Sequence, residues 1–295
     1  MKLSIITINR NNAEGLRKTL ASVASQTYHD IEHIVIDGAS TDTSVDVIRK
    51  YESSNQSPSH PLTVTWISEP DNGIYNAINK GIKRATGDYI YILNSGDALV
   101  APNVVERIMA VLQLEIGNCK LKNGVPILLG NIIQVYPDGR KIREAKYHSC
   151  KDTAPKAIDA SMLTFYRGTI PHDAAFVRRD LFEKYGYFDE TMHICADWKL
   201  YLDMIALGDI VPMYVDIDVV LFDMTGVSNV NNELRLKERW AYLEQVLPAS
   251  VLKDYDAYAT PIVQYNRIHK HHLWGLVHFM ERVLFKLEKW GILRR

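Results

Sequence analysis

Short apolar runs alternate with amphipathic segments over the first hundred residues of the chain. Residues 3–8, 31–36, 62–67 and 88–93 are rich in β-branched and aromatic side chains, as buried strands of this length are. After each of the first three runs, apolar residues recur at three- and four-residue intervals, which predicts a helix. These positions are Leu16, Leu20 and Val23, then Val45, Ile48 and Tyr51, and then Ile74, Ala77, Ile78, Gly81, Ile82 and Ala85.

This alternation predicts an α/β fold, Rossmann-like, in which a mostly parallel central sheet carries helices on both faces. Gly87 follows the third helix, where glycine commonly ends helices. After residue 102 the pattern is mixed, with helices expected over 104–114 and 197–206. Short strands are expected over 125–130, 132–136, 174–179, 211–215 and 218–222, with a hairpin turn at 137–140.

From Asn232 onward the pattern is helical. We expect interruptions near Pro248 and Pro261, because proline disrupts the interior of a helix. The segment 262–295 carries seven basic and two acidic side chains, a net charge of +5 in a chain whose total is −1. The C-terminal part therefore predicts a helical extension that differs electrostatically from the rest.

The composition is that of a folded protein, since 47% of residues are apolar and 23% are charged. No apolar run is long enough to predict a spanning helix, and the first residues lack the apolar core of a secretory signal. Cys119, Cys150 and Cys195 are too widely spaced for a disulfide framework or a zinc site, so we expect a cytoplasmic protein. The near-neutral charge gives no reason to expect nucleic-acid binding.

Polar, acidic and small residues follow all four predicted strands of the first hundred residues. In an open parallel sheet the carboxyl ends of the strands lie at one edge, and ligands bind there. Each cluster alone also fits the chemistry of a turn or an N-cap. Together they predict a pocket that hydrogen-bonds a nucleoside and holds a hard cation. The residues are Thr7, Asn9 and Arg10, then Asp37, then Asp71 and Gly73, and then Asn94, Ser95 and Asp97.

No glycine-rich phosphate loop follows the first strand, which argues against a dehydrogenase or a P-loop enzyme. The segments SIITINRN, VIDGASTD, SEPDNGIYNAINKGI and ATGDYIYILNSGD, with the later PHDAAFVRRDLFEKYGYFDE and ADWKLYLDMI, resemble family-two glycosyltransferases of the GT-A fold. The resemblance extends from about Met1 to Asn232. SEPDNGIYNAINKGI, LNSGD and FDMTGVSNVNNE together are especially similar to the bacterial subgroup that builds capsular, colanic-acid-type and O-antigen polysaccharides.

This resemblance implies a nucleotide-sugar donor, with a UDP-sugar favoured and a GDP-sugar as the alternative. It also implies Mn²⁺ or Mg²⁺ and inverting transfer to a hydroxyl of a glycan or lipid-linked acceptor. On this basis, residues 1–115 form the nucleotide-sugar-binding half of the GT-A domain, residues 116–230 the acceptor-binding half, and residues 231–295 a basic, amphipathic helical extension.

The resemblance also assigns roles to residues of the donor half. Thr7, Asn9 and Arg10 match the first-strand motif that lines the nucleotide pocket; Gly73 and Ser95 belong to the donor-binding set as well. Asp37 matches the acid that contacts the nucleoside, and Asp71 matches the one that meets the base. Asn94 to Asp97 occupies the place of the family's acidic metal motif, but Asn94 replaces the first acid, so only Asp97 supplies a carboxylate.

In the acceptor half, Asp197 matches the family's catalytic base, although an Asp in a first helical turn also favours the helix dipole. His172 matches a histidine near the donor diphosphate or the acceptor, and a structural histidine fits equally well. Trp198 is expected to provide an apolar wall or to stack on a sugar. Ser228 lies in a small-residue loop expected to close over the site.

The apolar stripe from Leu273 to Trp290 and the basic residues near its end fit a peripheral helix at the inner face of the plasma membrane. They fit equally well a helix packed on its own domain or on a second copy of the chain. Two other functions remain open: a sugar-nucleotide pyrophosphorylase, and a non-catalytic sugar-binding or partner subunit, which the depleted metal motif allows.

Overall fold

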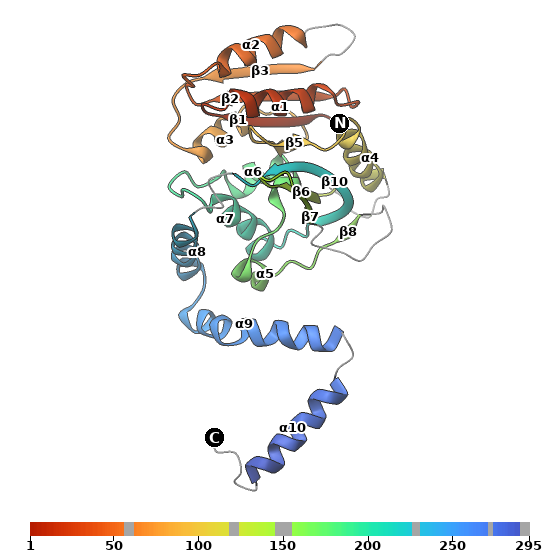
Figure 1. Cartoon of the computed structure of the whole chain (residues 1–295), viewed down its shortest axis with the longest axis vertical. Helices are drawn as coiled ribbons and strands as arrows, with labels where there is room; N and C mark the ends of the chain where they lie inside the picture. Colours follow the sequence, from red (N-terminus) through yellow and green to blue (C-terminus); the bar gives the residue numbers. More distant parts are fainter. Residues whose placement is uncertain (56–61, 118–123, 145–154, 226–230, 271–273, 290–295) are drawn as a thin grey trace. The chain divides into compact units, whose positions relative to one another are not determined.

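The computed structural model describes residues 1–55, 62–117, 124–144, 155–225, 231–270 and 274–289. The chain forms two compact units, Met1–Trp240 and Ala241–Arg295. The first unit contains a ten-stranded sheet whose main path runs β3-β2-β1-β4-β9-β6-β10-β5. Figure 1 shows β3, β2 and β1 side by side at one edge of this sheet.

The four strands predicted in the first hundred residues form the parallel part of this sheet, so the α/β prediction is confirmed. Their bounds are β1 (Leu3–Asn9), β2 (Ile31–Asp37), β3 (Thr63–Ser68) and β4 (Tyr89–Ile92), and the three helices after the first three strands are α1 (Ala13–Ala24), α2 (Ser44–Ser54) and α3 (Ile74–Ile82). Asn9 pairs with Asp37, and Asp37 pairs with Ser68, so the carboxyl ends of β1, β2 and β3 lie level.

Helices cover both faces of this parallel region. Leu16 of α1 and Ile48 of α2 pack in one buried cluster with Val35 of β2. Helix α3 packs on the opposite face, where a side chain at Gly81 would lie 2.4 Å from Ile6. Glycine at this position therefore lets α3 approach the sheet closely.

The second half of the sheet is mixed. It contains β5 (Ala98–Leu99), β6 (Ile127–Val135), β7 (Lys141–Glu144), β8 (Lys156–Ala157), β9 (Ala175–Arg178) and β10 (Met213–Asp223), and helix α4 (Val104–Gly117) precedes β6. Strand β9 is antiparallel to both β4 and β6, whereas β6 and β10 are parallel. A turn with Gly139 at φ +82° joins β6 to β7, as the 137–140 motif predicts.

The structure joins two pairs of predicted short strands. Residues 127–135 form one strand instead of two, and β10 continues from 213 to 223 with register shifts around Asp218. Polar residues break the apolar pattern at these places but satisfy one another across the strands. Asn131 donates to Asp216 at 2.8 Å and to Asp218 at 3.1 Å.

Short helical segments connect these strands. They are α5 (Met162–Arg167), the 3₁₀ turn η1 (His172–Ala174), α6 (Asp180–Tyr185), α7 (Ala196–Leu202) and the π-helical η2 (Asp203–Leu207). The helix predicted over 197–206 is thus α7 continued by η2. Helices α5 and α6 are too short to show a clear apolar period, and the sequence pattern does not predict them.

Three helices complete the chain: α8 (Asn232–Val246), α9 (Ala249–Lys270) and α10 (Trp274–Lys289). The interruption predicted near Pro248 is confirmed, because α8 ends before it. The interruption predicted near Pro261 is wrong, because α9 continues through this residue. A proline removes one helical hydrogen bond, and here that loss does not end the helix. Over the described residues, no helix has the length and apolar character needed to cross a membrane.

Candidate active site

Asp37 is the centre of a hydrogen-bond network at the ends of the parallel strands. Its carboxylate accepts from Asn9 at 2.8 Å, from the Ser40 hydroxyl and backbone at 2.6 and 2.9 Å, and from Ser68 at 2.7 Å. Burial alone would raise its pKa, but the hydrogen bonds from Ser40, Ser68 and Asn9 lower the pKa below its usual value. Because its pKa is lowered, Asp37 is ionised even though it is fully buried, and its carboxylate joins the strand ends at this edge.

Asp71, which follows β3, lies against Gly38, which follows β2. Lys80 of α3 lies 3.2 Å from one of its carboxylate oxygens. The other oxygen lies over Gly38, where an added Cβ would be only 2.4 Å away, so a side chain at Gly38 would displace Asp71. Gly73 begins α3 at φ +113°, a conformation that favours glycine, and is exposed. Arg10 is exposed beside this edge.

Thr7 does not present its side chain to this edge, which corrects the prediction that it lines the pocket. Its hydroxyl is fully buried and lies 2.9 Å from His33 Nε2, and His33 Nδ1 lies 2.7 Å from the Tyr51 hydroxyl. Burial lowers the pKa of His33 to about 3, so this histidine is neutral. The side chain of Thr7 therefore belongs to the packing between the sheet and α2.

Asp97 is a buried carboxyl group in an acidic surrounding. Its Oδ1 accepts a hydrogen bond of 2.8 Å from the Asp223 backbone at the end of β10. Burial, together with the charges of Asp173 and Asp223, raises the pKa of Asp97 to about 7, against the opposing effects of that hydrogen bond and of Lys18. A cation beside Asp97 would favour its ionised form.

The turn before Asp97 supplies further oxygen atoms. Asn94 Oδ1 is buried and has no hydrogen-bond partner among the described residues, and the same is true of Asn9 Oδ1. Ser95 accepts from the amide of Asn12 through its carbonyl at 3.3 Å and its hydroxyl at 3.5 Å. Gly96 has a φ of +106°, which lets the chain turn toward Asp97.

The oxygen atoms of Asn94 and Asp97 are of the type that Mn²⁺ and Mg²⁺ prefer. Among the described residues, no group of three or more His, Cys, Asp or Glu side chains is placed to hold a metal ion. The two residues therefore fit a hard cation only if other ligands, such as donor phosphates, complete its coordination.

Asp197 lies in the first turn of α7 and is held from two sides. His172 Nε2 donates to its Oδ2 at 2.7 Å, and the Tyr75 hydroxyl lies 3.0 Å from its Oδ1. Burial alone would raise the pKa of Asp197, but His172 and these hydrogen bonds lower it. Burial also opposes protonation of His172, yet Asp173 and Asp197 raise its pKa to about 10. The carboxylate is ionised and 19% exposed, as a proton acceptor must be.

Asp173 links the two acidic centres. Its charge raises the pKa of Asp97, and its carboxylate lies 3.5 Å from His172, which binds Asp197. Burial raises the pKa of Asp173 itself, and the charge of Asp197 adds to that rise against the lowering effect of His172. Asp173 therefore connects the region of the predicted metal ligand Asp97 with His172 and the predicted base Asp197.

Tyr75 connects the two halves of the domain, and the sequence interpretation assigned it no role. It comes from α3, stacks on Phe188 with 5.7 Å between ring centroids, and lies 2.6 Å from the Ile194 carbonyl. Nearby, Asn79 donates to the Phe188 carbonyl and to Glu190, both at 2.8 Å. Helix α3 thus fixes the segment that leads into α7.

Glu238 of α8 supports the same segment. Its carboxylate accepts hydrogen bonds from three consecutive backbone N–H groups, those of His193 at 2.7 Å and of Ile194 and Cys195 at 3.0 Å. These groups directly precede α7, so Glu238 positions the backbone that carries Asp197. Glu238 lies in the predicted C-terminal extension, and no sequence motif points to this role.

Trp198 is buried and so is not available to stack on a sugar, which corrects that part of the prediction; its role as an apolar wall stays a prediction. It is 1% exposed, its indole donates to the Phe165 carbonyl at 2.9 Å, and the Arg239 guanidinium lies 5.2 Å from its ring centroid. Trp198 therefore packs α7 against α5 and α8. Ser228 lies outside the described residues.

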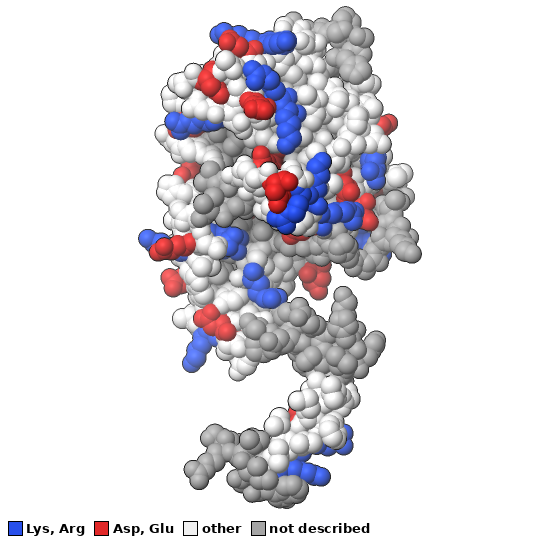
Figure 2. Space-filling model, in the orientation of Figure 1, with Lys and Arg blue, Asp and Glu red and all other residues white. Residues whose placement is uncertain are grey.

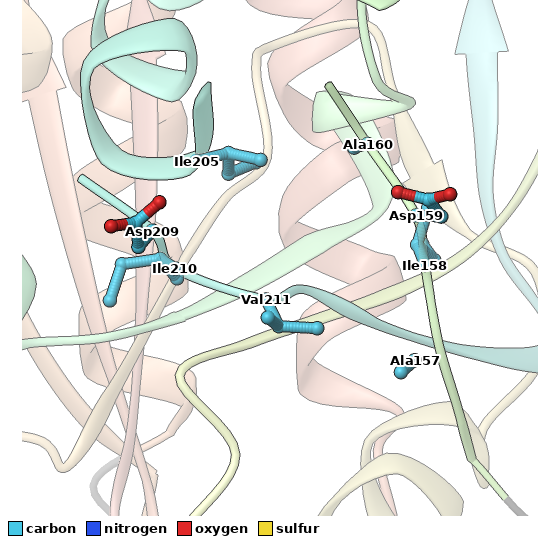
Figure 3. Close-up of a pocket in the computed structure, with 8 residues that line it drawn as sticks. All are labelled: Ala157, Ile158, Asp159, Ala160, Ile205, Asp209, Ile210 and Val211. Atoms are coloured by element: carbon cyan, nitrogen blue, oxygen red, sulfur yellow. The ribbon is translucent and has the colours of Figure 1, made fainter. Parts of the chain in front are cut away.

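A shallow depression of about 420 Å³ lies elsewhere on the first unit. Figure 3 shows it between the segment around Asp159 and the connection from η2 to β10, which includes Asp209. None of the predicted site residues lines it.

Comparisons with known proteins identify the fold and the family. The fold is GT-A. The model of glycosyl transferase family 2 matches residues 4–186, which is more than half of the chain, and the protein belongs to this family. It is a nucleotide-sugar glycosyltransferase, so the pyrophosphorylase alternative is not supported.

Two mycobacterial proteins are among the similar sequences. The uncharacterized glycosyltransferase Rv1514c of Mycobacterium tuberculosis is 32% identical over 231 residues, which cover 77% of each chain. The PGL/p-HBAD biosynthesis glycosyltransferase Rv2957 of the same organism is 27% identical, over 77% of this chain and 78% of that protein.

Solved structures with the same fold include S. aureus TarS 1–349 in complex with UDP and with UDP-GlcNAc. Both match with a TM-score of 0.56 and 18% identity. The match with the UDP complex covers 76% of this chain but only 61% of the TarS chain.

Proposed function

We propose that the protein transfers a sugar, with inversion, from a nucleotide-sugar donor to a hydroxyl of a glycan or lipid-linked acceptor in bacterial polysaccharide biosynthesis, such as that of capsule or O-antigen. Residues 1–115 bind the donor, and residues 116–230 bind the acceptor. A UDP-sugar is the favoured donor, which the UDP and UDP-GlcNAc complexes of TarS support at the level of fold. The observation that carries the proposal is the ionised Asp197, held by His172 and Tyr75.

The proposed step is an in-line displacement at the anomeric carbon. The acceptor oxygen forms a bond to this carbon while the bond to the donor phosphate breaks, and the nucleoside diphosphate leaves with the electron pair. The acceptor hydroxyl loses its proton to Asp197 as it attacks. The protonated His172 holds the carboxylate in place and stabilises its ionised form, which keeps the base ready before the acceptor arrives.

We further propose that Asn94 and Asp97 hold Mn²⁺ or Mg²⁺ together with the donor diphosphate. The ion would supply positive charge that stabilises the leaving diphosphate. The unpartnered Asn94 Oδ1 and the raised pKa of Asp97 support this assignment, since both unfavourable features are relieved when a cation binds.

A donor panel tests the function. The protein is mixed with UDP-, GDP-, dTDP- and CMP-sugars and Mn²⁺, and thermal stabilisation and release of the nucleoside diphosphate are measured for each. We expect one donor class to stabilise the protein, by about 2.7 kcal/mol at 100 times its Kd, and to be hydrolysed slowly. Clean binding of a donor without any turnover would instead favour a non-catalytic sugar-binding subunit, and unchanged turnover in excess chelator would contradict the metal proposal.

Helix α10 supports peripheral contact with an anionic membrane, where a lipid-linked acceptor would be found. Its exposed apolar side chains include Phe279, Met280 and Leu284, and Arg282 and Lys286 lie beside them. Figure 2 shows basic side chains next to a wide uncharged surface on this helix. A helix of this kind buries its apolar face at the lipid interface while its basic face meets anionic headgroups.

A further inference from the structure

Two arginines on one face of α8 have no acidic partner within the part of the chain that the structure describes. Arg235 and Arg239 are four residues apart, so their side chains project from the same side of the helix. The Nε atom of each is buried and makes no hydrogen bond with any described residue. Over the described part of the chain, the salt bridges include neither residue, and Arg235 bonds only the neutral amide of Asn232.

Three other arginines of the same unit have acidic partners. Arg143 pairs with Asp216 and Asp218, Arg178 with Asp180, and Arg179 with Glu183. A guanidinium that loses contact with water normally gains a carboxylate in this way, because an unpaired buried charge is costly. Of these three, Arg178 is the one whose side chain is largely covered, at 21% exposed; the pair on α8, with buried Nε atoms, has no such carboxylate among the described residues.

The nearest acid on the same helix does not neutralise the pair. Glu238 directs its carboxylate to the backbone N–H groups of residues 193–195. Burial and the charge of Arg235 lower the pKa of Arg239, against the opposing effect of its contact with the Cys195 sulfur and of the charge of Asp197. The face of Trp198 gives Arg239 a cation–π contact, but this contact leaves the hydrogen-bonding edge of the guanidinium without an anion.

The pair lies next to the proposed base. The Cys195 thiol donates to the Arg235 carbonyl at 3.4 Å, and the charge of Asp197 acts on Arg239. An anion held here would therefore be close to the carboxylate that removes the acceptor proton.

We propose that Arg235 and Arg239 bind a phosphate-class anion of the acceptor, and that this contact places the acceptor hydroxyl near Asp197. Guanidinium groups match phosphate oxygens in a bidentate geometry, and two of them on one helix face suit a diphosphate better than a single charge. The assignment of the anion to the acceptor rests on the proposed function, whereas the anion site itself does not.

The test is calorimetric titration of the full chain with inorganic pyrophosphate, with UDP present at a concentration that saturates its own site. We expect binding by the wild type and a loss of at least about tenfold in affinity in R235Q/R239Q, since charge-assisted bidentate pairs are removed. R235K/R239K keeps the charges but loses the planar fork, so we expect intermediate affinity. K237Q removes an exposed charge from the same helix and should bind pyrophosphate like the wild type.

Several results would overturn the proposal. Unchanged pyrophosphate binding by R235Q/R239Q would show that these arginines do not form the site. Pyrophosphate that binds only when UDP is absent is displaced by UDP, and this result would assign the arginines to the donor diphosphate. If the double variant does not fold, the single variants R235Q and R239Q are compared with K237Q by the same titration. Pyrophosphate binding that depends on the pair, in a protein that transfers no sugar, would uphold the anion site and contradict the proposed function instead.

Discussion

Replacement of Asp197 by Asn separates the proposed base from its structural role. The side chain keeps its size and still offers one oxygen, so contact with either His172 or Tyr75 can persist. It cannot accept the proton of the acceptor hydroxyl. We expect the transfer rate to fall by roughly 10²–10⁴, or about 2.7–5.5 kcal/mol in the barrier, which is the usual contribution of a general base.

The same substitution has a second, spectroscopic consequence. His172 has its pKa raised to about 10 because Asp173 and Asp197 surround it, and removing one carboxylate must lower that pKa. The assays are kcat for transfer, titration of the nucleotide sugar, and the NMR titration of His172. We expect the donor Kd to change little, because Asp197 belongs to the acceptor half in our proposal.

D203N is the matched control for D197N. Asp203 follows α7 directly and pairs with Lys199 at 3.2 Å, so this variant also removes a carboxylate from a charged pair in the same region. We expect transfer by D203N to remain within a few-fold of the wild type. Transfer by D197N at a rate close to the wild type would remove Asp197 from the mechanism, and parallel loss of donor binding would make it a structural residue.

Three further predictions follow from the same structure. E238Q should lower kcat more than it raises the KM for the donor, because the amide holds residues 193–195 less firmly than the carboxylate; equal effects in the control K237Q would refute this. Without divalent ions, D97N should stabilise the fold above pH 7 by up to roughly 4 kcal/mol, because burial raises the pKa of Asp97 from 3.8 to about 7. This gain in stability should decline as the pH falls from 7 toward 4 and vanish below about pH 4, where the carboxyl is protonated in both folded and unfolded chains. The free energy of unfolding is measured by urea unfolding at several pH values. Removal of residues 273–295 should release the protein from anionic vesicles in a sedimentation assay, while circular dichroism should show that the remaining chain is still folded. A full-length protein that does not bind such vesicles at low salt would contradict the membrane proposal.

The sequence predicted the parallel half of the sheet well because its signal is local. Apolar runs such as 3–8 and 31–36 report burial on both faces, and their polar ends mark the ligand edge. Motif resemblance also placed Asp97 and Asp197 on the elements that the structure brings into one region. It gave the positions of Thr7 and Trp198 but not the directions of their side chains, and both prove to be internal.

The residues that sequence reasoning missed act over long separations. Tyr75 and Asp197 are 122 residues apart, and the Asp223 backbone and Asp97 are 126 residues apart. Glu238 and the backbone of residues 193–195 are likewise joined only in the fold. No hydrophobic period or turn signal encodes such contacts, since they depend on how β10 returns to Asp97 and on how α3 and α8 pack against the segment around the start of α7.

The place of α8 determines where this enzyme can be cut. The sheet ends at Asp223 and the last motif ends at Glu233, and a fragment designed from them would stop there. It would discard Glu238, together with Arg239 and its contact with Trp198. The smallest fragment that keeps these contacts therefore extends through α8 to Val246. A fusion, or a replacement of the C-terminal segment, should be made between Val246 and Ala249, where α8 has ended and α9 has not begun.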